Sequence, residues 1–154
     1  MQNSKESSIT ENRKARHDYE IIKYFEAGLA LEGWEIKSLR AHRVQLKDSY
    51  AVCKKNEIWL LNSHISPLSS ASTHIHPEPY RSRKLLLKRK EINELIGAVQ
   101  RKGLSIIPLK LYWNRSYVKL SLALCRGKKA HDKRQATADR DWKRQQERLR
   151  KHGH

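Results

Sequence analysis

The chain has 154 residues, which is enough for one domain of ordinary size and a short tail, and this excludes a large multidomain enzyme. It carries 33 Lys and Arg residues against 16 Asp and Glu, a formal net charge of +17. A surface with such an excess of one sign repels itself unless a polyanion neutralises it, so nucleic acid is the first partner to consider. No run approaches the ~20 apolar residues that a membrane-spanning helix requires, so we expect no membrane protein.

The N-terminus and the cysteines indicate a reducing compartment. The first residues contain no apolar stretch of the kind that a secretory signal uses, and two cysteines do not make a disulfide framework. We therefore expect a cytoplasmic location. Cys53 and Cys125 lie in strand-like segments without CxxC or Cys/His spacing, which favours small buried hydrophobic residues over metal or redox chemistry.

The N-terminal part is predicted to hold a leader, a helix and a strand. Residues 1–11 are polar and Ser-rich, which is typical of a flexible leader, so order should begin near Asn12. The apolar positions of residues 19–29 have helical spacing and predict a short amphipathic helix. Trp34 and Ile36 then alternate with charged residues, which predicts a strand.

The middle of the chain is predicted to begin with two strands. Tyr50 and Val52 lie between polar neighbours, and a turn at Asn56-Glu57 leads into a continuous apolar run at 58–61. Both patterns indicate strands.

The loop and the second helix follow. Residues 67–80 are rich in Ser and Pro, which favours a loop. The apolar residues of 85–99 share one helical face, with Ser82 as a possible N-cap and Gly103 beyond the end.

The clearest prediction is a β-hairpin. Apolar residues alternate with mostly polar ones from Ile107 to Trp113 and again from Val118 to Leu124, on either side of a turn at 114–116. Gly127 closes this apolar pattern.

The last segment, residues 126–154, holds eleven Lys and Arg against four Asp and Glu. Trp142 and Leu149 are too few apolar side chains to offset an ordering cost of ~1 to 2 kcal/mol per residue, so we expect a tail that is disordered when free. Its composition nevertheless favours helix once a surface supplies contacts.

The predicted organisation is a leader at 1–11, a domain at 12–126 and a basic tail at 127–154. We expect the domain to be mainly β, an OB-like antiparallel β-barrel with two to three flanking helices. Such barrels satisfy their sheet edges by closure, and they commonly bind nucleic acid.

No motif indicates catalysis, a cofactor or a metal. The sequence holds no P-loop, GxGxxG, HExxH or GxSxG motif. His74 and His76 could face one side of an extended segment, but no third ligand is positioned with them. His131, Asp132 and Lys133 offer groups that a nuclease uses, but in a tail without a core to hold them, so contact with RNA is the favoured interpretation.

A polar and basic cluster precedes the first predicted helix. Asn12, Arg13, Arg16 and His17 can reach phosphates and hydrogen-bond or stack on unpaired bases. From composition alone, a merely solvated basic leader is equally consistent with this cluster.

Further candidates lie around the predicted helices. Arg81, Arg83 and Lys84 could grip one stretch of RNA backbone, and the alternative is a solvated helix entry. Glu26 could accept hydrogen bonds from base amino or ribose hydroxyl groups, or it could form a helical ion pair with Lys23.

Several longer sequence motifs are more specific indicators of a family than composition is. In chain order they are Asn12 to His17, Phe25 to Arg40 (FEAGLALEGWEIKSLR), Asp48-Ser-Tyr50, Ala71 to His74, Arg81 to Leu87 (RSRKLLL), Leu111-Tyr-Trp113 and Gly127 to Arg134 (GKKAHDKR). Together they closely resemble the SsrA-binding protein family, also called small protein B, over about residues 12–142. That family is the partner of transfer-messenger RNA in bacterial trans-translation.

The resemblance implies an OB-like barrel that binds the tRNA-like domain of transfer-messenger RNA, chiefly its elbow and D-loop, and substitutes for the missing anticodon arm. It also implies that the protein enters, together with this RNA, a 70S ribosome stalled on a message without a stop codon. Its tail would then lie in the vacant decoding site and message channel. The stalled peptide is then tagged for proteolysis. Alanyl-tRNA synthetase and elongation factor Tu would act on the charged RNA, and the protein would be a monomer without enzymatic activity.

The resemblance also assigns residues. It places on the RNA-binding face Asn12, Arg13, His17, Glu26, Leu85 and Leu86, with Lys37, Arg40, Arg81 and Arg83 as phosphate contacts. Near the decoding centre it places Gly127, Lys128, Lys129, His131, Asp132, Lys133 and Arg134, with Trp142 on a helix downstream. His42 stands where the family usually has Gly, and residues 145–150 are more polar than in many relatives.

Two other classes remain as alternatives. A structural ribosomal protein of OB type would share the charge and the barrel. An RNA-cleaving enzyme would have to use His131 or His74.

Overall fold

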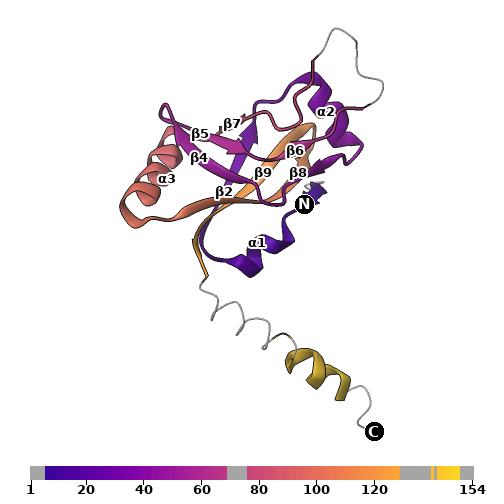
Figure 1. Cartoon of the computed structure of the whole chain (residues 1–154), viewed down its shortest axis with the longest axis vertical. Coiled ribbons are helices and arrows are strands. Elements are labelled where there is room, and N and C mark those ends of the chain that lie inside the picture. Colours follow the sequence, from indigo (N-terminus) through magenta and orange to yellow (C-terminus); the bar gives the residue numbers. More distant parts are fainter. Residues whose placement is uncertain (1–5, 69–75, 129–139, 141, 150–154) are drawn as a thin grey trace.

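The computed structural model describes residues 6–68, 76–128, 140 and 142–149 (Figure 1). Its elements in chain order are β1 (Glu6–Glu11), α1 (Arg13–Asp18), β2 (Tyr19–Leu29), α2 (Gly33–Arg40), β3 (Val44–Gln45), β4 (Tyr50–Lys54), β5 (Glu57–Leu61), β6 (His64–Ile65), β7 (Arg83–Leu86), α3 (Arg89–Lys102), β8 (Ser105–Asn114) and β9 (Tyr117–Gly127).

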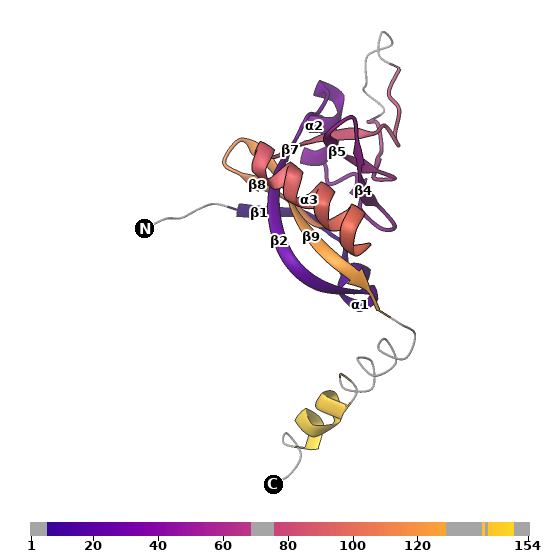
Figure 2. The same cartoon turned by 90° about the vertical axis from the view of Figure 1, so that its left-hand side faces the viewer.

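Strands of the larger of two sheets form a ring, and β3 and β6 pair separately in the smaller sheet. The larger sheet has the order β1-β8-β4-β5-β7-β2-β9, and β8 also pairs with β9, so the sheet returns on itself with antiparallel pairs. The contact between β4 and β8 is thin, with Ala51 opposite Ile106 as its one registered pair among the described strands. Figures 1 and 2 show α1 and α2 at opposite ends of the barrel and α3 along its side. The predicted class, a mainly β antiparallel barrel with flanking helices, is confirmed.

Two tight turns set the hairpins. Lys55 and Asn56 join β4 to β5 with φ of 53° and 58°, the left-handed pair that a two-residue type I′ hairpin requires. The hairpin of β8 and β9 turns at Arg115, whose φ is 59°, and its register runs from Ser105 opposite Cys125 to Asn114 opposite Tyr117. The alternation that predicts these strands therefore also sets which side chains enter the barrel.

The barrel encloses one core, and α1 covers a second, smaller one. Ile92 and Leu95 of α3 join the main core together with inward-facing residues of the strands. The smaller cluster contains Ala15, Ile107 and Cys125 under α1. Burial raises the pKa of the Cys125 thiol to about 11, so this cysteine is an inert apolar group, as the sequence predicts.

The prediction that order begins near Asn12 is wrong. Residues 6–11 form β1, which pairs with the edge of β8 that does not pair with β9. Ile9 of β1 is buried in the core. The imidazole Nδ1–H of His42 donates to the Ile9 carbonyl oxygen at 3.1 Å and holds β1 from the other side. His42 has φ of 56°, which explains why Gly suits this position and shows that His can replace it.

The predicted helix over 19–29 and strand at 34–36 are also wrong. Residues 19–29 form β2, because its register with β9 puts Phe25 and Ala27 in the core, and a bulge between Ile21 and Lys23 disturbs the period-two pattern. Residues 33–40 form α2, in which Trp34, Glu35, Ser38 and Leu39 are buried at helical spacing.

The predicted helix that begins after Ser82 is divided in two. Its first residues form β7, which pairs with β5 and β2, and α3 begins only at Arg89. The backbone N–H of Lys88 donates to the Glu91 carboxylate at 3.1 Å, which fixes this start. Gly103 ends α3 with φ of 64°, as predicted.

A buried ionic cluster fastens α2 to the strands. The Arg83 Nε–H donates to Glu35 Oε2 at 2.6 Å, and both side chains are fully buried. Arg83 also donates to Ser63 O at 2.9 Å and to Pro79 O at 3.1 Å. The other carboxylate oxygen of Glu35 accepts hydrogen bonds from Arg81 Nη2 and from the Glu32 backbone N–H. One carboxylate thereby joins α2, β7 and the segments that precede each of them.

The protonation of this cluster follows from its contacts. Burial raises the pKa of the Glu35 carboxyl, but the hydrogen bonds from Arg81, from the Glu32 backbone and from Arg83 outweigh burial, so the pKa lies below its ordinary range. Burial lowers the pKa of Arg83, which stays a guanidinium opposite the carboxylate.

We expect Glu35→Gln to lower the free energy of unfolding by about 3 to 5 kcal/mol at pH 7, because it leaves the Arg83 charge buried without a counter-charge. The folded-state pKa of Glu35 lies below the unfolded value, so its contribution is complete above the unfolded pKa and is lost as the pH falls through the folded pKa. Urea unfolding at a series of pH values should therefore show the gap between wild type and variant shrinking in acid.

The matched control is Glu94→Gln, which removes the exposed ion pair with Lys23. This change should cost at most about 1 kcal/mol. A Glu35→Gln effect as small as that of the control, or one that is independent of pH, would contradict this role of Glu35.

Candidate nucleic-acid interface

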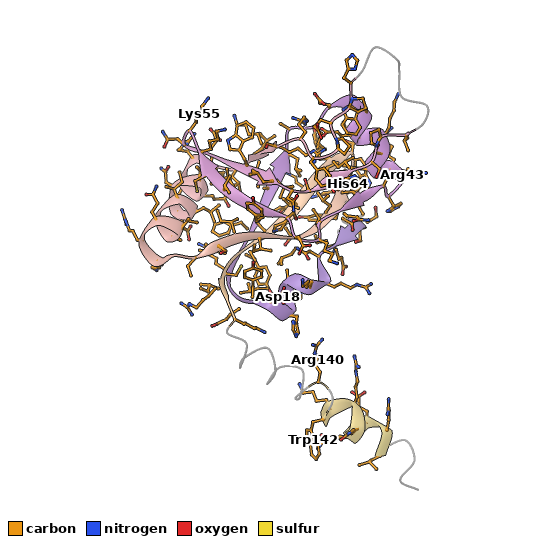
Figure 3. The ribbon with its side chains drawn as sticks, in the orientation of Figure 1. Asp18, Arg43, Lys55, His64, Arg140 and Trp142 are labelled. Atoms are coloured by element: carbon orange, nitrogen blue, oxygen red, sulfur yellow. The ribbon has the colours of Figure 1, made fainter. Side chains whose placement is uncertain are left out.

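One basic cluster lies at α1, where the tail begins. Arg13, Lys14 and Arg16 are exposed on this helix. The Lys128 backbone N–H donates to Asp18 O at 2.9 Å, and its Nζ donates to Arg16 O at 3.4 Å. Figure 3 labels Asp18 at this end of the barrel. The cations of α1 and the first residue of the tail after β9 therefore form one surface.

Acidic groups offset part of the positive charge of this surface. His17 Nδ1 lies 3.1 Å from Asp18 Oδ1, and Lys14 Nζ lies 4.0 Å from Asp18 Oδ2 and 3.9 Å from Asp48 Oδ1. A groove of about 630 Å³ beside α1 contains both aspartates. Of the predicted cluster, Arg13 and Arg16 are exposed cations that form no ion pair with a carboxylate of the described residues.

A second candidate surface surrounds Gly28 on the outside of the barrel. Gly28 lies opposite Lys119 of β9 and opposite Leu86 of β7, so these side chains share one face. Glu26, two residues earlier on β2, lies on the same face and is exposed. Leu86 is 51% exposed, which is unusual for a leucine in a strand that is paired on both sides. Glu26 and Leu86, distant in sequence, are therefore brought together.

Two further predicted cations are accessible on α2. Lys37 and Arg40 are exposed on the helix that the Glu35 cluster holds in place. Lys84 is partly exposed, and its Nζ lies 4.0 Å from the Glu57 carboxylate. Lys37 and Arg40 can therefore contact phosphates without first breaking an ion pair shown in the structure.

Four of the predicted RNA contacts have structural roles within the described fold. Leu85 and Arg83 are fully buried, one in the core and one in the Glu35 cluster. Asn12 is buried, and its amide donates to Pro108 O at 3.0 Å, which ties α1 to β8. Arg81 is half-buried and bound to Glu35 and to the Ala30 carbonyl. In this conformation these side chains are bonded within the protein or buried, and their direct contact with RNA stays a prediction.

The tail residues are only partly described. Gly127 ends β9 and Lys128 follows it, but Lys129, His131, Asp132, Lys133 and Arg134 lie outside the described residues, as does His74. Residues 142–149 are helical and exposed, with Trp142 on this segment (Figure 3). Disorder of the free tail and helix formation on the ribosome both stay predictions.

The sequence interpretation missed a shallow groove at one end of the barrel. We name it the hairpin-tip groove; its walls include Leu31, Ile36, Leu86, Trp113, Tyr117 and Lys119. Its volume is about 310 Å³. The signal available in the sequence was the pair of aromatic residues that flank the turn of the β8–β9 hairpin, but their exposure could not be read from alternation.

The described residues show no catalytic or metal-binding constellation. No group of three His, Cys, Asp or Glu side chains that could hold a metal ion occurs within the described ranges. Among the helices that the structure describes, none has the length and apolarity needed to span a bilayer.

In the pair of neighbouring leucines, only the first should matter for stability. Leu85→Ala should lower the free energy of unfolding by about 2 to 5 kcal/mol, because it empties a core position. Leu86→Ala should stay within about 0.5 kcal/mol of wild type, because half of this side chain is already in water. Urea unfolding of both variants measures the difference, and equal losses would contradict the assigned orientation of β7.

A barrel with patches of accessible cations, an exposed leucine and acidic acceptor, and a basic extension defines the class of OB-like nucleic-acid-binding proteins. Comparison with known proteins places the chain within this class. The model of the family described as SmpB protein matches residues 9–152, and the chain belongs to this family.

Relatives and one solved structure agree with this assignment. The SsrA-binding protein of Thiobacillus denitrificans is 55% identical over 142 residues, which are 92% of this chain and 95% of the relative. That of Bordetella avium is 54% identical over 145 residues, with 94% and 95% covered. A chain from a structure described as "tmRNA-SmpB: a journey to the center of the bacterial ribosome" is 47% identical, with a TM-score of 0.66 and coverage of 83% of this chain and 93% of that chain.

Proposed function

We propose that this chain binds the tRNA-like domain of transfer-messenger RNA and delivers that RNA to stalled ribosomes. The observation that carries the proposal is the family membership over nearly the whole chain, with relatives named for binding SsrA. The net charge of +17 supports it independently, because phosphate neutralisation is the main source of affinity for RNA.

The barrel supplies recognition in this proposal. Arg13 and Arg16 on α1 and Lys37 and Arg40 on α2 are exposed cations that can contact phosphates. Glu26 offers an acceptor to base amino groups or 2′-hydroxyls beside the apolar surface of Leu86, a combination suited to shaped RNA with unpaired nucleotides. Asn12, Arg81, Arg83 and Leu85 act indirectly, because they hold the elements that carry these groups.

The tail supplies placement on the ribosome. Residues from Gly127 to Arg134 would contact the vacant decoding site, and the helix that carries Trp142 would lie in the message channel. A basic segment with few apolar groups gains order when an RNA-lined channel supplies contacts. The RNA then substitutes for a charged tRNA, alanyl-tRNA synthetase and elongation factor Tu act on it, and the stalled peptide is tagged. The protein acts as a cytoplasmic monomer without catalysis of its own.

We expect deletion of residues 129–154 to leave binding to the tRNA-like domain within a few-fold and to abolish peptide tagging. The deletion begins after Lys128 because the Lys128 backbone N–H bonds to α1. Binding is measured by titration of the RNA and tagging in a reconstituted translation reaction with a message that lacks a stop codon.

Unchanged thermal unfolding of the truncated chain is the control for the barrel. Loss of RNA binding together with tagging in a folded truncated chain would contradict the proposed division between barrel and tail. Equal affinity of the full chain for ribosomal RNA and for the tRNA-like domain would instead favour a structural ribosomal protein.

A further inference from the structure

The small sheet of β3 and β6 carries a polar face on its outer side. Val44 and Ile65 pair in this sheet and are buried, so the residues next to them point outward. The Ser66 backbone N–H donates to Arg43 O at 3.0 Å, which continues the pairing by one residue. The outward side chains are those of Arg43, Gln45, His64 and Ser66. Together with Tyr80 we name them the β3–β6 face; Figure 3 labels Arg43 and His64 on it, at the end of the barrel where α2 lies.

Tyr80 adds an aromatic ring to this face. Its ring centroid lies 4.7 Å from that of His64 with an interplanar angle of 58°, and the Tyr80 side chain is 55% exposed. Ser66 Oγ lies 3.4 Å from His64 Nδ1 and orients the imidazole. An exposed ring that is supported by a second ring offers a platform on which an unstacked base can lie.

Main-chain hydrogen bonds fix the position of Tyr80. The Pro79 carbonyl oxygen accepts from the Ile65 backbone N–H at 3.0 Å and from Arg83 Nη2 at 3.1 Å. The Tyr80 backbone N–H donates to Glu78 Oε1 at 3.1 Å. Because Arg83 belongs to the buried ionic cluster, the fold itself determines where the exposed ring is presented. Such preorganisation lowers the entropy cost of binding a ligand.

The polar groups of the β3–β6 face match the parts of a nucleotide. Arg43 is exposed and forms no ion pair with a carboxylate of the described residues, so its guanidinium can bind a phosphate. The exposed Gln45 amide offers a donor and an acceptor side by side, the pattern that reads a base edge. The outward side chains include no aliphatic one, so an apolar peptide would gain little here.

We propose that the β3–β6 face binds one unpaired nucleotide of RNA, with the base on the Tyr80 ring, the base edge at Gln45 and the phosphate at Arg43. This inference rests on the proposed function and adds a nucleotide site on the smaller sheet, separate from the surface around Gly28 on the larger one. Transfer-messenger RNA and ribosomal RNA both offer unpaired nucleotides, and the experiment separates these two sources.

The test measures the affinity of the full chain for the tRNA-like domain, for full-length transfer-messenger RNA and for the 70S ribosome. Tyr80→Ala should weaken binding to at least one of them about 5- to 100-fold, the range found when an aromatic partner of a base is removed. Tyr80→Phe should bind as wild type does, because it keeps the ring. The RNA that responds identifies the source, and ultraviolet cross-linking to Tyr80 identifies the nucleotide.

Tyr50→Ala is the matched control, because Tyr50 is also an exposed tyrosine, on β4. It should bind as wild type does, and thermal unfolding checks that each variant is folded. The bonds that position Tyr80 are made by its backbone and therefore remain in Tyr80→Ala. Wild-type affinity of Tyr80→Ala for all three partners would overturn the inference. Equal weakening on a short RNA duplex without unpaired bases would also overturn it, since no base could then lie on the ring.

The phosphate contact has its own test. Arg43→Gln should reduce the slope of log affinity against log salt concentration by about 1 for the RNA that responds to Tyr80→Ala. Lys90→Gln, which removes an exposed cation of α3, is the control and should leave this slope unchanged. An unchanged slope in Arg43→Gln would remove Arg43 from the site.

The two proposals fail in different ways. If the wild-type chain does not prefer the tRNA-like domain to ribosomal RNA, the proposed function fails. If this preference is present and Tyr80→Ala binds all three partners as wild type does, the inference about the β3–β6 face alone is overturned.

Discussion

The carboxylate of Glu35 lies between two arginines, and the position of α2 depends on it. Arg83 reaches it from β7 and also binds the carbonyls of Ser63 and Pro79, while Arg81 caps the opposite oxygen. Such a cluster is costly to bury and contributes little net stability over an apolar replacement, but it is strongly directional, because each donor has one partner position. It fixes where Lys37 and Arg40 are presented, and it orients β7 so that Leu85 enters the core while Leu86 faces outward.

That constraint explains why a protein with 33 Lys and Arg residues turns some of these side chains towards its interior. Arg81 and Arg83 belong to a motif shared with an RNA-binding family, yet their donors are occupied by the protein itself. Under the proposed function, they would contribute to RNA binding by shaping the surface around Gly28 and α2. The exposed cations would then provide attraction, and the exposed leucine and glutamate would provide selectivity, which is the usual division between phosphate and base contacts.

The sequence predicted the β8–β9 hairpin, the hairpin of β4 and β5, the end of α3 at Gly103 and the barrel class, because alternation and turn residues encode these locally. It failed at residues 19–29 and 33–40, where apolar spacing over a few residues suits either period and where pairing with β9 and burial of Glu35 decide the outcome. The strand β1 escaped prediction because one buried residue, Ile9, fixes it. Arg13, Arg16, Glu26, Lys37, Arg40 and Leu86 were found from motifs as accessible candidates, but Asn12, Arg83 and Leu85 show that a motif does not reveal whether a side chain faces RNA or the core.

The most direct test of the central claim, selective binding of one structured RNA, is to recover the full chain from a bacterial lysate at moderately high salt and to sequence the retained RNA. Salt weakens contacts that depend on charge alone far more than those that depend on shape and base recognition. Transfer-messenger RNA should dominate the retained RNA. A broad mixture, or ribosomal RNA alone, would contradict it and would mean that net charge is the whole basis of binding.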